Sequence, residues 1–162
     1  MSTTDTDRAE AIRLWQHAHK AQLAGQFTKA LRLYRESLEI YPTAEAHTYM
    51  GWTLSQLGRH EEAIEQCKLA IDIDPEYGNP YNDIGSYLIQ LERREEAIPW
   101  LDKAIAAPRD DARAYPYLNL SRVYDHLGKL YLAKDALEKA IAEEPTFWRA
   151  RQAYWLIVGK LN

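Results

Sequence analysis

Apolar residues recur every three or four positions along most of this chain. Between residues 51 and 71, for example, apolar residues at helical spacing are Leu54, Leu57, Ile64 and Ile71, whereas a half-buried strand would alternate apolar and polar residues at every second position. Turns are expected near Gly25, Gly58, Glu92 and Gly128, and prolines follow at Pro42, Pro75, Pro108 and Pro145. The pattern predicts an all-α chain of helical hairpins, each of which ends before a proline.

The hairpin sequence repeats along the chain. The segment GWTLSQLGRHEEAIEQCKLAI begins at Gly51, and GSYLIQLERREEAIPWLDKAI begins 34 residues later at Gly85. Small residues recur at one position in the first helix and at two positions in the second helix of each hairpin. The three sets are Ala18, Gly51, Gly85 and Ser121; then Ala30, Ala63, Ala97 and Ala133; then Ser37, Ala70, Ala104 and Ala140. Because small residues let two helix backbones cross almost in contact, these positions predict the helix crossings.

This pattern resembles the tetratricopeptide repeat (TPR) family, whose unit is a helix-turn-helix of about 34 residues with alternating small and large apolar positions. The resemblance covers residues 11 to 145. It implies an all-α fold in which four hairpins stack into a right-handed α-α superhelix, a TPR solenoid, closed by a capping helix. We expect repeats at about 11–43, 44–77, 78–113 and 114–147 in a single domain of residues 8–162, preceded by a disordered tail of residues 1–7.

Several local features modify this picture. The segment PRDDAR adds two residues before the fourth hairpin, and Glu92 stands where the other turns have glycine. Pro99 falls inside a second helix, where proline removes a backbone hydrogen bond, so we expect a kink or a late helix start there. Asn79 precedes Pro80 in the way that a capping residue precedes proline at the first helical position, so we expect Asn79 to cap a first helix.

The C-terminal segment predicts one further helix, at about residues 146–161, without a partner hairpin. Its apolar stripe consists of Phe147, Ala150, Tyr154, Ile157 and Leu161. A capping helix over the exposed core of the last hairpin explains this stripe, because an open stack of repeats requires such a cap. The alternative is a swapped or dimerising helix, which Trp148 and Trp155 beside the stripe favour.

Composition and charge narrow the classes of partner. A net charge of -4 and a pI near 5.7 leave no basic surface for a phosphate backbone, so we expect no nucleic acid ligand. The longest strongly apolar run, from Tyr154 to Val158, is far too short to cross a membrane, and the N-terminus lacks the apolar core of a signal peptide. The only cysteine, Cys67, lies at an apolar-periodic position and is expected to be a buried thiol. We therefore expect a cytoplasmic protein.

The resemblance also implies where a ligand binds, because the first helices of TPR hairpins line a concave groove. The groove positions with the chemistry of a binding site are Trp15, His19, Tyr49, Trp52, Asn82, Tyr115, Asn119 and Arg122. Trp, Tyr and Arg dominate binding hot spots, and asparagine hydrogen-bonds to peptide backbones. The alternative is that these rings only fill the space between neighbouring hairpins. A second contact surface is predicted at Trp100, Trp148 and Trp155, with Trp100 facing outward from a second helix.

Family members that hold the C-terminal carboxylates of heat-shock chaperones use Lys, Arg and Asn at fixed groove positions. Counted from the first hairpin, the matching positions carry Trp15, His19, Tyr49, Asn79 and Asp83. Counted from the second hairpin, they carry Thr48, Trp52, Asp83, Tyr115 and Asn119. Neither set contains a cation, so we expect a peptide or helix that docks through apolar or aromatic side chains.

Sequence motifs of catalysis are missing. The chain contains no glycine-rich phosphate loop, no HExxH and no nucleophile elbow, and we expect neither cofactor nor metal. His17 and His19 point about 200 degrees apart on a helix and therefore do not chelate one metal ion. The sequence predicts a non-catalytic scaffold or adaptor that binds a partner protein in its groove. The alternative is a structural protein that assembles with itself through the C-terminal helix or the convex face.

Overall fold

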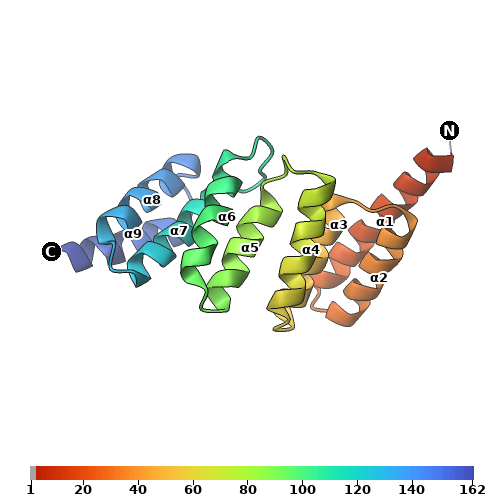
Figure 1. Cartoon of the computed structure of the whole chain (residues 1–162), viewed down its shortest axis with the longest axis horizontal. Coiled ribbons are helices and arrows are strands. Elements are labelled where there is room, and N and C mark those ends of the chain that lie inside the picture. Colours follow the sequence, from red (N-terminus) through yellow and green to blue (C-terminus); the bar gives the residue numbers. More distant parts are fainter. Residues whose placement is uncertain (1–2) are drawn as a thin grey trace. The chain divides into compact units, whose positions relative to one another are not determined.

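The computed structural model describes residues 3–162, which form nine helices and no strand (Figure 1). The helices are α1 (Thr3–Leu23), α2 (Phe27–Ile40), α3 (Ala44–Gln56), α4 (His60–Ile73), α5 (Asn79–Gln90), α6 (Arg94–Ala106), α7 (Ala114–His126), α8 (Leu130–Glu143) and α9 (Trp148–Leu161). They fall into two compact units, one that ends at Pro75 and one from Glu76 to Asn162, and each is described by itself. The all-α prediction is confirmed, while a single domain of residues 8–162 stays a prediction. None of the helices within residues 3–162 has the length and apolar content of a membrane span.

The N-terminal unit consists of two helical hairpins, α1–α2 and α3–α4, with α3 also packed against α2. Ala18, Ala30 and Ala63 are completely buried at the helix crossings. A Cβ atom added at Gly51 would lie 3.0 Å from the carbonyl oxygen of Ala63. The backbones of α3 and α4 therefore cross almost in contact, as the small residues predicted.

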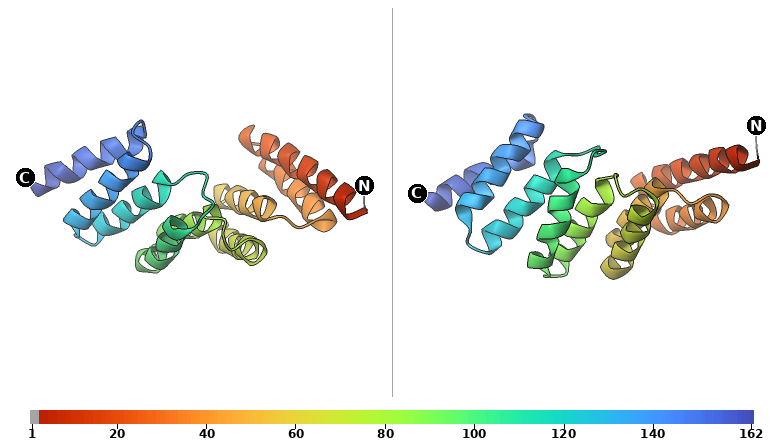
Figure 2. Two further views of the ribbon diagram at one scale, coloured as in Figure 1. Left: turned by 90° about the horizontal axis from the view of Figure 1, so that it is seen from above. Right: turned by 45° about the horizontal axis from the view of Figure 1, so that its top comes forward.

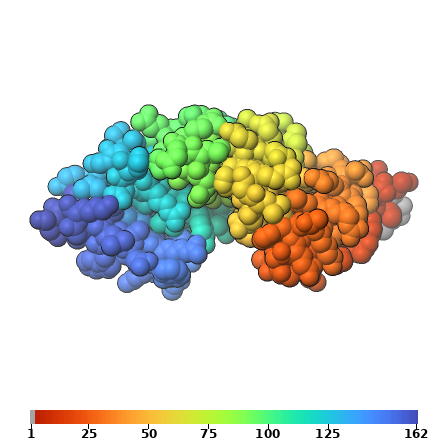
Figure 3. Space-filling model, turned by 90° about the horizontal axis from the view of Figure 1, so that it is seen from below, coloured from red at the N-terminus to blue at the C-terminus, as the bar shows by residue number. Residues whose placement is uncertain are grey.

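The C-terminal unit consists of the hairpins α5–α6 and α7–α8 followed by α9, which packs against α8 (Figure 2). One buried cluster joins Leu118 of α7, Leu137 of α8, and Phe147, Ala150 and Ile157 at α9. The predicted apolar stripe therefore covers the core of the last hairpin. In Figure 3 the surface of this unit changes from green through cyan to blue, so its successive hairpins occupy neighbouring parts of that face.

All four hairpin turns have a residue in the left-handed backbone region, at the positions predicted. The φ angles are 74° at Gly25, 75° at Gly58, 64° at Glu92 and 71° at Gly128. Glycine adopts this conformation at no steric cost, whereas the Cβ of Glu92 crowds the backbone. The third hairpin therefore has the same left-handed turn as the other three, although its turn residue is not glycine.

The start of α5 differs from the prediction. Asn79 was expected to cap the helix, but Gly78 occupies the cap position without a side-chain cap bond, and Asn79 is the first helical residue. The Asn79 side chain instead bonds to Asp111, since its Oδ1 accepts from the Asp111 backbone N at 3.2 Å and its Nδ2 donates to Asp111 Oδ2 at 3.4 Å. Tertiary contacts with the loop before α7 therefore replace the local cap.

The PRDDAR insertion forms an ordered loop that pairs with the segment before α5. The Gly78 backbone N donates to the carbonyl oxygen of Arg109 at 2.6 Å, and the Arg109 backbone N donates to that of Glu76 at 3.1 Å. The Arg109 guanidinium lies 3.9 Å from the centre of the Tyr77 ring, a cation-π contact. The two extra residues therefore link the start of α5 to the end of α6.

Two further expectations are corrected. Residues 3–7 belong to α1 and are not disordered, and Asp5 in the first turn favours the positive end of the helix dipole; residues 1 and 2 of the predicted tail lie outside the described residues. Helix α6 begins at Arg94 and continues through Pro99, so the late helix start is wrong, while the alternative of a kink stays a prediction. Packing of Leu101 and Ala104, both fully buried, offsets the hydrogen bond that proline removes.

Candidate functional site

The predicted groove residues all lie on the first helices of their hairpins, and they fall into both units. Trp15 and His19 lie on α1, and Tyr49 and Trp52 lie on α3. The remaining four belong to the C-terminal unit, with Asn82 on α5 and with Tyr115, Asn119 and Arg122 on α7. The structure therefore presents two groups of candidate residues, one in each unit.

In the N-terminal unit, Trp15, His19 and Tyr49 form an aromatic cluster between α1 and α3. The rings of Trp15 and Tyr49 stack with their centres 5.5 Å apart and their planes 25° from parallel. The His19 ring lies 4.5 Å from the Tyr49 ring. The three side chains are half-buried, so they fill the space between α1 and α3 and also keep part of their surface accessible.

One polar atom of the aromatic cluster has no hydrogen-bond partner. His19 Nδ1 is buried and makes no hydrogen bond within the described residues. A buried polar atom without a partner carries a desolvation cost. Trp52, also half-buried, lies one helical turn after Tyr49 on α3 and extends the aromatic character of this helix.

In the C-terminal unit, Asn82, Asn119 and Arg122 form a polar network between α5 and α7. Asn119 Nδ2 donates to Asn82 Oδ1 at 3.0 Å, and Arg122 Nη1 donates to Asn119 Oδ1 at 3.1 Å. Asn119 is buried, whereas Arg122 is exposed and has no carboxylate partner within the described residues. The Asn119 amide is thus used inside the protein, where it orients Asn82 and Arg122.

A carboxyl group with an unusual pKa lies beside this network. Asn82 Nδ2 donates to Asp83 Oδ1 at 3.4 Å. Burial raises the pKa of Asp83 to about 7, with a further contribution from the charge of Asp110. The pKa of Asp110 is also raised by burial. No local sequence pattern connects these two residues, because 27 positions separate them in the chain.

The other predicted aromatic residues have different surroundings. Tyr115 packs against Phe147 with ring centres 4.8 Å apart and remains 36% exposed. Trp100, which was expected to face outward from a second helix, is half-buried, and its ring centre lies 6.2 Å from the Tyr81 ring and 4.9 Å from Lys103 Nζ. Its bulk fills space within the α5–α6 hairpin.

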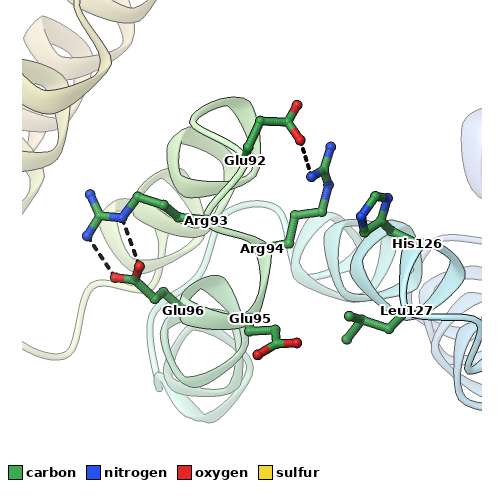
Figure 4. A pocket seen from close by; sticks show the side chains of 7 residues that line it. All are labelled: Glu92, Arg93, Arg94, Glu95, Glu96, His126 and Leu127. Carbon is green, nitrogen blue, oxygen red and sulfur yellow. Dashed lines mark hydrogen bonds and ion pairs between the residues drawn. The ribbon is translucent and has the colours of Figure 1, made fainter.

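A pocket of about 390 Å³ lies at the turn ends of α5, α6 and α7 (Figure 4). It is lined by Glu92, Arg93, Arg94, Glu95, Glu96, His126 and Leu127. Arg93 donates two hydrogen bonds to Glu96, at 2.9 and 2.7 Å, and Arg94 pairs with Glu92. These two ion pairs leave the charge of Glu95 uncompensated, so the pocket has a small excess of negative charge. Within the described residues, no group of three His, Cys, Asp or Glu side chains is arranged to hold a metal ion.

Comparison with known proteins identifies the family. Sequence models of the tetratricopeptide repeat match residues 44–77, 79–111 and 114–147, which together make up more than half of the chain. The chain belongs to the tetratricopeptide repeat family. The hairpin α1–α2 lies before the matched residues, but it has the same left-handed turn, at Gly25, and the same small crossing residues. The TPR fold predicted from the sequence is confirmed.

Two relatives of this TPR chain are longer proteins, and the chain matches only a part of each. The small glutamine-rich tetratricopeptide repeat-containing protein 2 of Mycosarcoma maydis is 30% identical over 103 residues, which are 63% of this chain and 29% of that protein. The heat-shock protein cognate (HSC) co-chaperone sgt12 of Aspergillus fumigatus is 26% identical over 99 residues, which are 60% of this chain and again 29% of the relative. The chain thus spans under a third of the length of these two relatives.

Solved structures share the fold over most of the chain. The crystal structure of MamA has a TM-score of 0.72 and 30% identity, over 88% of this chain and 83% of the MamA chain. YrrB, described as a TPR protein with an unusual peptide-binding site, has a TM-score of 0.68 and 19% identity, over 93% of this chain and 77% of YrrB. The second likeness supports the fold alone.

Proposed function

We propose that this TPR chain is a non-catalytic scaffold or adaptor that binds a segment of a partner protein on the first-helix face of its hairpins. The observation that carries the proposal is the half-exposed aromatic cluster of Trp15, His19 and Tyr49. A relative that is described as a heat-shock protein cognate co-chaperone supports it. A binding role also explains why large rings lie on a face that water alone would keep polar.

The aromatic cluster supplies apolar contact area for a side chain of the ligand. Stacked Trp15 and Tyr49 are already ordered by their own contact, so they lose little side-chain entropy when a ligand binds. The His19 ring lies 4.5 Å from the Tyr49 ring and helps to hold it in place. We therefore expect a large apolar or aromatic residue of the partner to be the main anchor.

The polar network of the C-terminal unit supplies hydrogen bonds. Arg122 presents an exposed guanidinium that Asn119 holds in place, which favours a carbonyl or carboxylate group of the ligand. Asn82 lies at the other end of the network. In this proposal Asn119 acts as a positioning residue, and Asn82 and Arg122 contact whatever segment binds to the C-terminal unit.

The co-chaperone relatives do not imply the same ligand for this chain. The positions that correspond to a carboxylate clamp carry aromatic, acidic and neutral side chains, including Trp15, Tyr49 and Asp83. An acidic carboxyl-terminal peptide would gain no cation at these positions. We infer that the free C-terminus of the ligand contributes little to binding.

The proposal is tested with a peptide selected from a random display library against the full chain. Trp15→Ala and Tyr49→Ala should each weaken binding by about tenfold or more, because each removes a central aromatic contact. The matched control is Tyr131→Ala, which removes an aromatic ring that is 78% exposed on a second helix. Fluorescence anisotropy measures affinity, and circular dichroism checks that the helices remain.

The outcomes separate the alternatives. If Trp15→Ala and Tyr49→Ala leave affinity unchanged while helical content holds, the rings only fill space and the proposal is wrong. Amidation of the peptide C-terminus should leave affinity unchanged. A large loss on amidation would indicate a carboxylate clamp instead.

A further inference from the structure

The outer face of α9 exposes three large apolar side chains. Trp148, Trp155 and Leu156 are 63%, 68% and 65% exposed, whereas Ala150 and Ile157 on the opposite side of the helix are buried. Trp148 and Trp155 are seven residues apart and therefore lie two turns apart on one side of the helix. We call Trp148, Arg149, Arg151, Trp155 and Leu156 the α9 outer face.

The repeat register shows that this face does not accept another TPR helix. Trp155 lies 34 residues after Ser121, the small crossing residue of α7. The same position carries Ala18, Gly51 and Gly85 in the other hairpins, where the second helix packs almost against the backbone. An indole ring at this position would hold a second helix away and leave voids beside it. The exposed rings therefore suit a contact of another kind.

The charge on α9 indicates the chemistry of that contact. The helix contains three basic residues and no acidic one. Lys160 Nζ pairs with Asp125 Oδ1 at 2.5 Å, but Arg149 and Arg151 have no carboxylate partner within the described residues. The Arg149 guanidinium lies 5.6 Å from the centre of the Trp148 ring, and Arg151 Nη1 donates to the carbonyl oxygen of Pro145 at 3.1 Å. Both positive charges are therefore uncompensated beside the exposed rings.

A neighbouring charge adds to this positive field. Arg122 of α7 also lacks a carboxylate partner within the described residues, and the charge of Arg149 lowers the pKa of Arg122 after the larger effect of partial burial of its side chain. Guanidinium groups close enough to affect each other strengthen the attraction for an anionic group. The positive charge thus extends from α9 to the first-helix face of α7.

We propose that the α9 outer face docks an acidic amphipathic segment of a partner protein. The apolar side of the segment would cover Trp148, Trp155 and Leu156, and its Asp or Glu side chains would pair with Arg149 and Arg151. A second copy of α9 fits less well, because it would bring Arg149 and Arg151 toward arginines of the same sign. This surface is separate from the aromatic cluster of the N-terminal unit.

The probes are synthetic helical peptides that share one stripe of Leu and Phe and differ only in the flanking residues, which are Glu, Gln or Lys. Titrated into the full chain at low salt, the Glu peptide should bind about tenfold or more tightly than the Lys peptide, and salt should reduce the difference. Trp155→Ser and Trp148→Ser should each lower the affinity for the Glu peptide by about tenfold or more. The double charge reversal Arg149→Glu with Arg151→Glu should reverse the preference, so that the Lys peptide binds more tightly than the Glu peptide.

Control variants keep the result interpretable. Tyr131→Ser removes an exposed ring of α8 and should leave the binding of the Glu peptide unchanged. Trp15→Ala should also leave the binding of the Glu peptide unchanged. The test of the α9 outer face is therefore independent of the test of the aromatic cluster. Thermal unfolding of each variant checks that α9 stays packed.

Three results would overturn the proposal. The first is equal affinity for the Glu and Lys peptides, and the second is no binding of any peptide. The third is a dimer in sedimentation velocity that Trp155→Ser dissociates, since that would make a second copy the occupant of the α9 outer face.

Discussion

Gly85 of α5 lies directly against Leu101 of α6. A Cβ atom added at Gly85 would lie 2.5 Å from Cδ2 and 2.6 Å from Cγ of Leu101. Leu101 is completely buried, so a shift of its side chain would disturb the packed core around it. The closeness of α5 and α6 therefore depends on the absence of a side chain at residue 85.

Replacing Gly85 by a large residue should separate these helices. Gly85→Leu is expected to lower the free energy of unfolding by about 1 to 3 kcal/mol or more, because the added carbons overpack the crossing. Ala63→Leu should have a similar effect on the α3–α4 crossing, where Ala63 is completely buried. Urea unfolding followed by circular dichroism measures both.

Gly159→Leu is the matched control for the crossing variants. Nothing lies within 4 Å of a Cβ atom added at Gly159, and leucine favours a helix over glycine by up to about 1 kcal/mol. This variant should be as stable as the original chain or more stable. Full stability in both Gly85→Leu and Ala63→Leu would mean that the crossings lie elsewhere.

The turn at Glu92 should be improved by glycine. Glu92 has a φ angle of 64°, so Glu92→Gly removes the crowding of its Cβ atom and should raise the free energy of unfolding by about 1 kcal/mol. The lost ion pair with Arg94 is mostly exposed on the Glu92 side and contributes little. Glu95→Gly, in the first turn of α6, should instead lower the free energy of unfolding by up to about 1 kcal/mol. A change of the same sign in both would contradict this explanation.

The raised pKa of Asp83 makes stability depend on pH. In the window between its ordinary value of 3.8 and about 7, the folded chain holds a proton that the unfolded chain has released. The free energy of unfolding therefore falls as the pH rises through this window. The raised pKa of Asp110 acts in the same direction.

Asp83→Asn is neutral at every pH and should flatten this dependence. At about pH 8 the variant should be more stable than the original chain by on the order of 2 kcal/mol, after allowance for the partial exposure of Asp83. Chemical unfolding at several pH values measures the effect. Asp102→Asn, at an exposed position of α6, should leave the pH profile unchanged. An unchanged profile in Asp83→Asn would show that Asp83 is charged throughout this range.

A buried hydrogen bond ties α1 to α2. The hydroxyl of Tyr34 donates to Gln22 Oε1 at 2.5 Å, and both side chains are buried. Tyr34→Phe leaves the Gln22 oxygen without this donor and should lower the free energy of unfolding by about 1 to 3 kcal/mol. Tyr131→Phe, at an exposed position, is the control and should have no measurable effect. Equal stability of the two variants would mean that water replaces the lost donor.

Much of the candidate site followed from the repeat register, and part of it did not. The register placed Trp15 and Tyr49 on neighbouring first helices, where the structure stacks them. It also placed Asn119 on α7, but it did not reveal that Asn119 is buried and bonded to Asn82 and Arg122. The repeat register predicts which side of its helix a residue occupies. It does not predict the hydrogen-bond partners, because these lie on other helices.

The sequence by itself determined the helical period, the hairpin register, the turns and the crossings. These features depend on the backbone preference of each residue and on spacing within one repeat, so a single chain contains enough information to predict them. Only the tertiary structure decided how the polar side chains are partnered. Asn79 pairs with Asp111 and Asn119 pairs with Asn82, across 32 and 37 residues of chain, and Asp83 acquires its raised pKa by burial. Hydrogen bonds and desolvation of this kind arise from groups that folding brings together from separate helices, and no local pattern encodes them.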